Sequence, residues 1–301
     1  MKLGGIASFV AVAEGGSISG AARTLRLSKS VVSERLAELE RSLGATLLHR
    51  TTRRVSVTED GAAFLERAKR ILREVSEAAA DLSERRGTLG GPIRIAAPVT
   101  FGRMHLGPAL YPFLAANPEI EMSLELDDRR VDIASDVYDG VVRHGAIDDS
   151  RLMVWRLAPS RRVLVASEAY LSVNGMPATT TQLAAHKGLF YTNRGVADWR
   201  FLTPGGIEIV RARIGFRVNN GDMLRDAAIA GLGIALLPLF IAGPDIRDGK
   251  LKIVDVGVRP DAEFVFLAHP EGRRPSAKLR ALAAHLKASF GDPPYWEDGV
   301  G

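Results

Sequence analysis

The sequence SISGAARTLRLSKSVVSERLAELERSLG, residues 17–44, has the pattern of two short helices joined by a tight turn. Ser28 is a side-chain acceptor suited to the start of a helix, and Gly44 is suited to its end. Between them, apolar residues recur at steps of four and three, the spacing of one buried helix face. These residues are Val32, Leu36, Leu39 and Leu43. The stretch therefore predicts a helix-turn-helix unit.

The N-terminal end of the second helix is the part that enters the major groove of DNA in helix-turn-helix proteins. Residues 47–57 follow as two short strands around a basic tip, which predicts a wing that contacts phosphates or a minor groove. We therefore expect a DNA-binding domain over residues 1–58. The candidate DNA-contacting residues are Ser28, Lys29, Ser30, Ser33, Glu34, Arg35, Arg50, Thr51, Arg53 and Arg54.

The positive charge of the chain is concentrated in its first third. The formal net charge is +5, and the first 90 residues carry 15 Lys and Arg against 11 Asp and Glu, whereas the rest of the chain carries 25 against 24. A polyanion such as double-stranded DNA is the natural partner of such a segment. Charge alone leaves open that these side chains are only solvated.

A long helix is predicted over residues 59–87, between a capping Thr58 and a Gly-rich boundary. Its apolar residues form a heptad seam, which favours pairing with a second copy of the chain. The alternative is an amphipathic helix that packs on its own domain. The seam residues are Phe64, Ala68, Ile71, Val75, Ala78 and Leu82.

From residue 91 onward strands and helices alternate, which predicts an α/β architecture with two lobes. Residues 291–301 are rich in Pro and Gly and are expected to be frayed. Ligands of open α/β sheets bind beyond the carboxyl ends of strands, which directs attention to residues 98–102. There the Thr100 hydroxyl, beside free N–H groups, suits an anion; the alternative is that Thr100 only caps a helix.

Polar residues elsewhere in the α/β region are candidates to close over a ligand. Asn in turns is often structural, and an ion pair of Arg143 and His144 with Asp128 or Asp139 is an alternative to ligand binding. The candidate effector-binding residues are Val99, Thr100, Phe101, Arg143, His144, Asn193, Asn219 and Asn220.

The sequence argues against an enzyme, a metal site or a membrane protein. It has no cysteine, and its six histidines lack metal-ligand spacing. No phosphate-binding loop or nucleophile elbow is present in it. The uncharged run 227–244 is interrupted by Gly and Pro and is expected to be buried core. With a poor signal-peptide pattern at the N-terminus, the composition favours a cytoplasmic protein without a cofactor.

Several strings in both halves of the chain match one family. FVAVAEGGSISGAA at 9–22, LSKSVVS at 27–33 and TEDG at 58–61 resemble the DNA-binding half of LysR-type transcriptional regulators. IRIAAPVTFG at 93–102 and AGLGIALLP at 230–238 resemble their effector-binding half. Lys29 stands where the family commonly has Gln, and Glu34 stands where it commonly has a basic residue. Both differences affect the operator sequence that we expect the protein to prefer.

This resemblance implies an α/β fold class with an N-terminal winged helix-turn-helix, a long linker helix, and a two-lobed effector-binding domain like that of periplasmic binding proteins. It implies an effector domain over 91–301, with lobe I at about 91–161 plus 266–290 and lobe II at about 162–265. The implied function is sequence-specific transcriptional regulation in response to a small-molecule co-inducer. The implied assembly is a homodimer or a homotetramer.

Two other classes remain open at the level of the sequence. One is a solute-binding or catalytic α/β protein whose N-terminal helices serve only assembly. The other is a DNA-bending architectural protein without a ligand. The first predicts no salt-dependent affinity for DNA, and the second predicts no stabilisation by metabolites.

Overall fold

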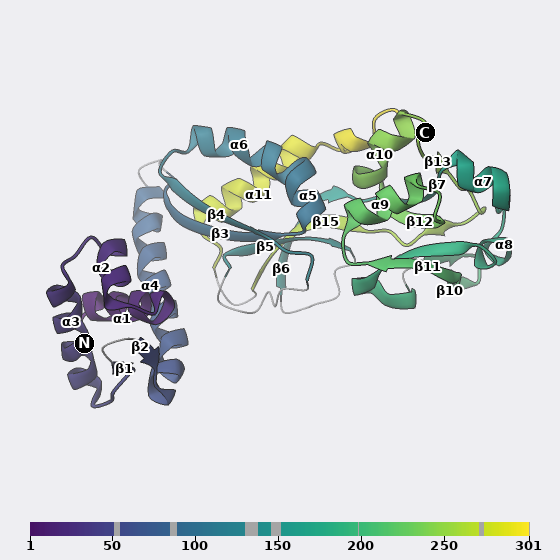
Figure 1. Cartoon of the computed structure of the whole chain (residues 1–301). Coiled ribbons are helices and arrows are strands. Elements are labelled where there is room, and N and C mark those ends of the chain that lie inside the picture. The colour runs from purple at the N-terminus through teal and green to yellow at the C-terminus, as the bar shows by residue number, and fades with distance from the viewer. Residues whose placement is uncertain are drawn as a thin grey trace. The chain divides into compact units, whose positions relative to one another are not determined.

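The computed structural model describes residues 1–50, 55–84, 89–129, 138–145, 152–197, 199–270 and 274–300. The chain divides into two compact units, Met1–Thr88 and Leu89–Gly301 (Figure 1). We call the first unit the head and the second the sensor.

The head contains four helices and one hairpin among its described residues. Ser17, Ser28 and Thr58 each accept a backbone N–H at the start of a helix, and Gly16 and Gly44 end helices with positive φ, as the sequence pattern predicts. The elements are α1 (Leu3–Gly15), α2 (Ile18–Thr24), α3 (Lys29–Leu43), β1 (Leu48–Arg50), β2 (Val55–Val57) and α4 (Glu59–Glu84).

The three-helix arrangement of the head is held by one apolar core. Phe9 of α1 and Leu36 of α3 are fully buried in it, and Leu47 joins them just before the hairpin. The strands β1 and β2 pair antiparallel with Leu48 opposite Val57. The Glu40 carboxylate accepts the backbone N–H groups of Leu47 and Leu48, which fixes the start of the hairpin to α3.

The first lobe of the sensor is built on the five-stranded sheet β4-β3-β5-β15-β6, in which β3 is parallel to β4 and β5 while β15 is antiparallel to β5 and β6. Helices α6 and α11 contact each other along this sheet (Figure 1). The elements are β3 (Gly91–Ala97), α5 (Val99–Phe101), the π-helical turn η1 (Gly102–Leu106), α6 (Gly107–Ala116), β4 (Ile120–Leu126), β5 (Gly140–Gly145), β6 (Leu152–Pro159), β15 (Phe264–Pro270), α11 (Ala277–Phe290) and the short 3-10 turn η3 (Tyr295–Glu297).

The second lobe is built on the sheet β11-β8-β12-β7-β13, with a small sheet β10-β9-β14 beside it. Helix α9 packs on β8 and β12 (Figure 1). The elements are β7 (Arg162–Ala166), α7 (Glu168–Asn174), α8 (Thr180–Ala184), β8 (Lys187–Tyr191), the 3-10 turn η2 (Thr192–Ala197), β9 (Arg200–Thr203), β10 (Gly206–Ile209), β11 (Arg213–Val218), α9 (Gly221–Ile229), β12 (Ile234–Pro238), α10 (Leu239–Arg247), β13 (Lys252–Ile253) and β14 (Arg259–Pro260).

The chain crosses between the lobes at two adjacent connections, residues 160–161 and residues 261–263. They are joined by the backbone N–H of Ser160, which donates to the carbonyl of Glu263 at 2.8 Å. We call these two connections the hinge. Strand β15 returns to the first sheet from Phe264 onward, where it pairs with Pro159 and Gly145.

The C-terminal tail is ordered up to residue 300, and the expectation that it is frayed is wrong. Trp296 is only 2% exposed and packs edge-on against Phe101, with Phe240 and Phe290 around it. The Tyr295 hydroxyl lies 2.7 Å from Nδ1 of His105. Composition pointed to fraying, but the buried Trp296 and Val300 and the contact of Tyr295 with His105 hold the segment.

We expect Gly61→Ala to destabilise the head by about 1–3 kcal/mol, because a Cβ at this position would lie 2.1 Å from the Leu47 carbonyl oxygen, a backbone atom that cannot give way cheaply. The matched control is Gly15→Ala at the end of α1, where a Cβ meets nothing within 4 Å. Chemical denaturation of both variants measures the difference, and equal stabilities would contradict the close packing of α4 on the hairpin.

Candidate functional site

The N-terminal end of α3 presents most of the predicted DNA-contacting side chains. Val32, Leu36 and Leu39 bury the opposite face of the helix, which leaves Ser28, Lys29, Ser30 and Glu34 exposed and Ser33 half-buried. The hydroxyls of Ser28 and Ser30 lie 2.8 Å apart, and Ser28 also accepts the N–H of Val31. The start of α3 therefore offers hydroxyls and one cation on a single exposed surface.

Arg35 differs from the other candidates on α3. Its guanidinium packs over Gly4 of α1, where an added Cβ would lie 3.2 Å from its Cζ, so this side chain also contacts the head itself. On the wing, Arg50 ends β1, and its side chain lies outside the described residues, as do Thr51, Arg53 and Arg54.

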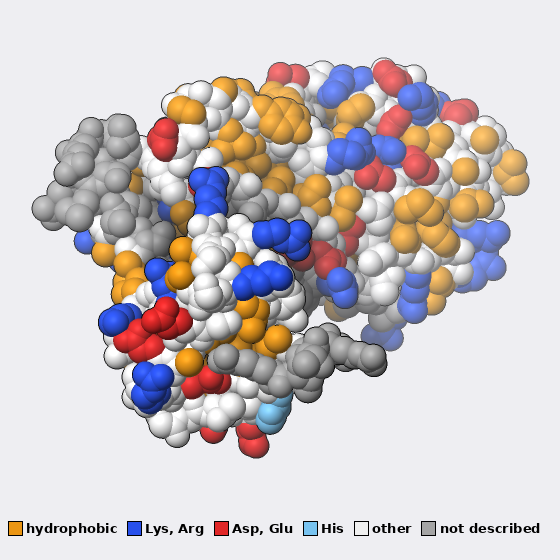
Figure 2. Space-filling view, turned by 60° about the vertical axis from the view of Figure 1, so that its left-hand side comes forward, with side chains coloured by type: hydrophobic (Ala, Val, Ile, Leu, Met, Phe, Trp, Pro, Cys, Tyr) orange, Lys and Arg blue, Asp and Glu red, His pale blue; other side chains and the backbone are white. Residues whose placement is uncertain are grey.

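The face of the protein drawn in Figure 2 carries mixed charge. Figure 2 shows Lys and Arg side chains interspersed with Asp and Glu on the face toward the viewer. One exposed pair is Lys2 with Glu38, 2.7 Å apart. Phosphate contacts are therefore expected from individual cations and not from a uniformly basic face.

The predicted pairing seam of α4 is divided. Ala68 is fully buried in the core of the head, and Phe64 and Ile71 pack against the same core. Ala68 is thus covered by its own chain, whereas Phe64 and Ile71 are half-buried, and pairing of the seam with a second copy stays a prediction. Val75 is 42% exposed and Ala78 is exposed, while the side chain of Leu82 lies outside the described residues. The exposed apolar residues of the seam thus begin at Val75, about three turns after Phe64.

A cavity of about 700 Å³ lies between the two lobes of the sensor, with the hinge on its wall. Its size is that of small-molecule sites in proteins. Five of the eight predicted effector residues line it: Thr100, Phe101, Arg143, His144 and Asn193. Val99, Asn219 and Asn220 are not on its wall.

The donors that the sequence assigned to an anion near Thr100 are engaged by the protein itself. The Thr100 hydroxyl donates to Asp222 of α9 at 3.1 Å, and the N–H of Val99 donates to Asp128 at 3.0 Å. The expectation of free N–H groups here is therefore wrong at Val99. Thr100 also does not cap α5, whose N-cap residue is Pro98 and which has no side-chain cap.

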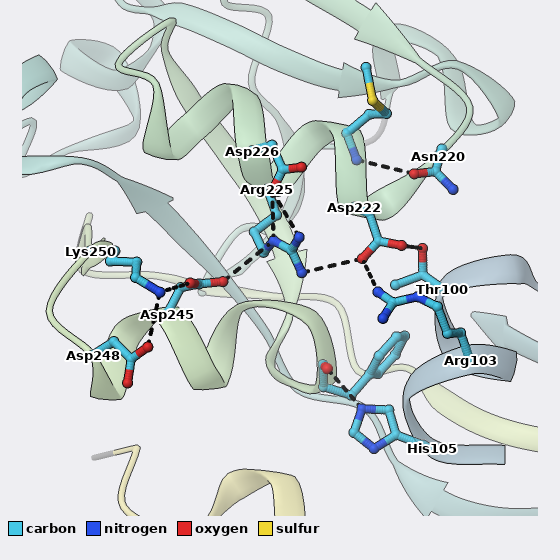
Figure 3. Close-up of polar contacts among 12 residues, drawn as sticks. Thr100, Arg103, His105, Asn220, Asp222, Arg225, Asp226, Asp245, Asp248 and Lys250 are labelled. Atoms are coloured by element: carbon cyan, nitrogen blue, oxygen red, sulfur yellow. Dashed lines mark hydrogen bonds and ion pairs between the residues drawn. The ribbon is translucent and has the colours of Figure 1, made fainter. Parts of the chain in front are cut away.

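Asp222 accepts three donors, two of which come from the first lobe, as Figure 3 shows. Arg103 of η1 donates to it at 2.9 Å from the first lobe, and Arg225 of its own helix donates at 3.2 Å. Asn220 donates to the Asp128 carboxylate at 2.9 Å, and its own Oδ1 caps α9 by accepting the N–H of Met223. Asn220 therefore has the structural role of an Asn at a helix start and also links the lobes.

The hinge holds a buried carboxylate that sequence analysis missed. Glu263 accepts hydrogen bonds from Arg194, from Nη1 at Oε1 and from Nη2 at Oε2, the latter at 3.0 Å. Arg162 Nη2 lies 3.1 Å from Oε1, and His144 Nε2 lies 2.9 Å from Oε2. Four nitrogen atoms of three side chains, from both lobes, therefore surround one carboxylate. The sequence signal was only one acidic residue before an apolar strand.

The geometry fixes the protonation of His144. Arg194 Nη2 lies 3.2 Å from Nδ1, and because a guanidinium only donates, Nδ1 accepts and Nε2 carries the hydrogen. Burial lowers the pKa of His144; the adjacent Glu263 carboxylate opposes this effect, and the charges of Arg194 and Arg162 add to it. The ring is therefore neutral at pH 7 and pairs with Glu263, not with Asp128 or Asp139 as the sequence alternative supposed.

The pKa of Glu263 is also lowered. Burial by itself raises it, but the hydrogen bond from His144 and the charges of Arg194 and Arg162 outweigh this effect. On the same wall, burial and then the charge of Asp128 raise the pKa of Tyr191 to about 12, against the opposing effect of Asn193, Arg194 and Arg143.

Two family models match this architecture: "Bacterial regulatory helix-turn-helix protein, lysR family" over residues 3–62, and "LysR substrate binding domain" over residues 86–291. The chain belongs to the LysR-type transcriptional regulators. This membership replaces both alternatives that the sequence left open. As a member, the chain has a DNA-binding helix-turn-helix domain and a domain of the kind that binds small-molecule effectors.

Full-length relatives support the same family. The chain is 30% identical to the regulator PtxR of Pseudomonas aeruginosa over 98% of this chain and 95% of that protein. It is 34% identical to the regulator CrgA of Neisseria meningitidis over 81% of each. The solved structure of Neisseria meningitidis CrgA matches with a TM-score of 0.56 and 30% identity, over 95% of this chain and 96% of that one.

In the described part of the chain, none of the helices has the length and apolar character needed to cross a membrane. The same residues hold no cluster of three or more His, Cys, Asp or Glu side chains arranged for a metal ion.

We expect Glu263→Gln to destabilise the sensor by about 3–5 kcal/mol at pH 7, because the amide leaves buried guanidinium groups without their counter-charge. The lowered pKa of Glu263 makes its contribution full at neutral pH; the contribution is lost as the pH falls below the ordinary carboxyl value of 4.5. The variant therefore approaches the parent protein in stability at low pH.

Urea titrations at several pH values measure this difference. The control is Glu208→Gln on β10, an exposed residue for which we expect a change within about 0.5 kcal/mol. A Glu263→Gln protein as stable as this control at pH 7 would contradict the structural role of the cluster.

Proposed function

We propose that this LysR-type regulator reads its operator with the N-terminal end of α3 and responds to a small molecule bound in the cavity between the sensor lobes. The observation that carries the proposal is the combination, in one chain, of an exposed Lys29–Ser30 helix start and a polar cavity of about 700 Å³. The proposed activity is binding, without catalysis and without a metal or other cofactor. Because the proposed partner is chromosomal DNA, we expect the protein in the cytoplasm.

Each expected domain has one proposed role. Residues 1–58 bind DNA, residues 59–87 pair two copies of the chain in a dimer, and residues 91–301 bind the effector. Lys29, Ser30, Ser33 and Glu34 are the proposed base-reading group, with the wing residues Arg50, Thr51, Arg53 and Arg54 on phosphates. A ligand that prefers one closure angle of the lobes changes the population of that state and thereby the affinity for DNA.

The proposal is tested by selecting genomic DNA fragments with the purified full-length protein at two salt concentrations. We expect enrichment of a two-fold symmetric site, with affinity that falls steeply as salt rises. Addition of a metabolite library to the same assay tests the effector response. Absence of both enrichment and salt dependence would contradict the DNA-binding role of the head.

We expect Lys29→Ala combined with Ser33→Ala to cost about 1–3 kcal/mol at the selected site and much less on unrelated DNA, because contacts with base edges carry the sequence preference. The control is Arg41→Ala, an exposed cation in the last turn of the same helix. Competition binding with specific and random duplexes measures the ratio, and equal losses on both would contradict the assignment of these residues to base reading.

We also propose a homodimer that uses the exposed part of α4, and assembly of two dimers into a homotetramer. We expect Val75→Glu to raise the dimer dissociation constant at least about tenfold, because a carboxylate would be buried in an apolar seam. Sedimentation equilibrium measures this constant, with the neighbouring exposed Glu74→Gln as control. Identical constants for Val75→Glu and the parent would remove α4 from the interface.

A further inference from the structure

Residues 291–300, which we call the strap, form a further link between the two lobes beside the hinge. They follow α11, which packs against the first sheet, and they lie along α10 of the second lobe (Figure 1). None of them belongs to a strand of either sheet. The strap therefore joins the lobes through its side chains and backbone carbonyl groups.

Trp296 of the strap packs between aromatic residues of both lobes. Its ring centroid lies 6.0 Å from that of Phe101 in α5 and 5.3 Å from that of Phe290 in α11, both in the first lobe. It lies 6.2 Å from that of Phe240 in α10, in the second lobe. The indole N–H has no acceptor among the described residues, so apolar packing holds the ring. Loss of this ring would leave an apolar gap at the junction of the lobes.

His105 and Tyr295 add polar contacts at the same junction. Nε2 of His105 in η1 lies 2.9 Å from the carbonyl oxygen of Phe240 in α10, and because a carbonyl only accepts, Nε2 carries the hydrogen (Figure 3). Nδ1 is then an acceptor and takes the Tyr295 hydroxyl at 2.7 Å. Burial lowers the pKa of His105, against the bond to Phe240, so the ring is neutral at pH 7, as these two bonds require. The two bonds connect the strap, the first lobe and the second lobe in series.

Helix α10 fits closely against the strap. Arg247 Nη1 donates to the backbone carbonyl of Asp298 at 3.0 Å. A Cβ at Gly243 would lie 3.1 Å from the backbone carbonyl oxygen of Trp296, so the glycine permits this close approach. The second lobe therefore holds the strap by its backbone as well as by the Trp296 side chain.

The hinge also contacts the strap. Arg161 Nη2 donates to the backbone carbonyl of Val300 at 3.2 Å, and the carbonyl of Arg161 accepts the N–H of Leu239, the first residue of α10. Closure about a hinge moves one lobe as a rigid body relative to the other. The groups that the strap contacts in the two lobes would then move apart, so the full set of contacts fits one closure angle.

The strap supports the aromatic part of the cavity wall from behind. Phe101 and Phe240 both line the cavity, one from each lobe, and both contact Trp296. The ring of His144, on the same wall, lies 5.3 Å from that of Phe240. Residues 291–300 themselves are not on the wall. Trp296 therefore acts on the cavity through Phe101 and Phe240.

We propose that the strap holds the two lobes at one closure angle and that Trp296 is a positioning residue, which sets the aromatic wall of the cavity without contact with the ligand. Its consequence for ligand binding rests on the proposed role of the cavity as the effector site. When the strap is loosened, the lobes populate further closure angles, and the apparent affinity for a ligand falls with the fraction of molecules in the competent one.

The test measures the distance between the lobes in the full-length protein without ligand. Because the chain has no cysteine, Ala284→Cys on α11 and Val173→Cys on α7, both exposed, place one spin label in each lobe. Dilution with unlabelled protein excludes distances between copies, and double electron–electron resonance gives the distance distribution. We expect one narrow distribution in the parent protein and a distribution at least about twofold broader after Trp296→Ala, because the lobes then sample further closure angles.

Trp199→Ala is the matched control. Trp199 is also fully buried and its N–H also has no acceptor among the described residues, but it packs in a cluster that lies within the second lobe. We expect this variant to lose stability without a broader distribution. Trp296→Phe keeps an aromatic ring in the strap and is expected to restore most of the parent distribution.

A variant of an exposed side chain covers the case in which Trp296→Ala does not fold. Arg247→Ala removes the donor to the Asp298 carbonyl from the surface of α10, and we expect it to broaden the distribution in the same direction. Its control is Arg217→Ala, an exposed arginine of β11 in the same lobe, which should leave the distribution unchanged.

The outcomes separate the strap from the effector site. An unchanged distribution in Trp296→Ala, or equal broadening by Trp199→Ala, overturns the strap and leaves the cavity as an effector site. For any compound of the metabolite library that binds the parent protein, we expect Trp296→Ala to raise the Kd at least about fivefold, and an unchanged Kd overturns the positioning role of Trp296. If no compound binds but the distribution broadens as expected, the effector site fails and the strap stands.

Discussion

The carboxylate of Glu263 is the constraint around which the sensor is arranged. It lies in the hinge, and the four nitrogen atoms around it come from β5 of the first sheet, from β7 at the start of the second lobe, and from η2. A buried charge is tolerated only when it is paired and its acceptor positions are filled. The positions of His144, Arg162 and Arg194 are therefore set together, and with them the part of the cavity wall that they form.

Two aspartates, Asp128 on the cavity wall and Asp222 on α9, also link the lobes, with less burial than Glu263. Asp222 binds donors of the first lobe and Asp128 binds donors of the second, so each lobe supplies a carboxylate to the other. The contacts of Asp222 are drawn in Figure 3, and together with those of Asp128 they link the two lobes. A ligand shifts the population of closure angles only if it binds one of them more tightly than the others. The polar groups that already link the lobes are the groups whose contacts such a ligand is expected to change.

In the head, the residues of α3 that stabilise the core and those proposed to contact DNA lie on different parts of the same helix. One face of α3 buries Val32, Leu36 and Leu39, while its first turn carries exposed hydroxyls and Lys29. On helix α4 the two roles lie at different points along the helix. Ala68 in its first half is part of the core of the head, and Val75 further along is an exposed apolar residue. The helix therefore serves both its own domain and, in our proposal, a second copy.

The sequence by itself determined the local elements of this protein. Capping residues such as Ser28 and Gly44 set the ends of helices, and the periodicity of the apolar residues gave their buried faces, because both depend on neighbours within a few positions. Family strings on either side of residue 88 pointed to the function. The tertiary structure alone decided which polar groups meet: Glu263 with Arg162 across the hinge, Thr100 with Asp222, and Val99 with Asp128. It also decided that Phe64 faces its own core and that Trp296 anchors the tail. Such pairings join residues up to 122 positions apart, and no spacing along the chain encodes them, because they depend on how whole sheets and helices pack.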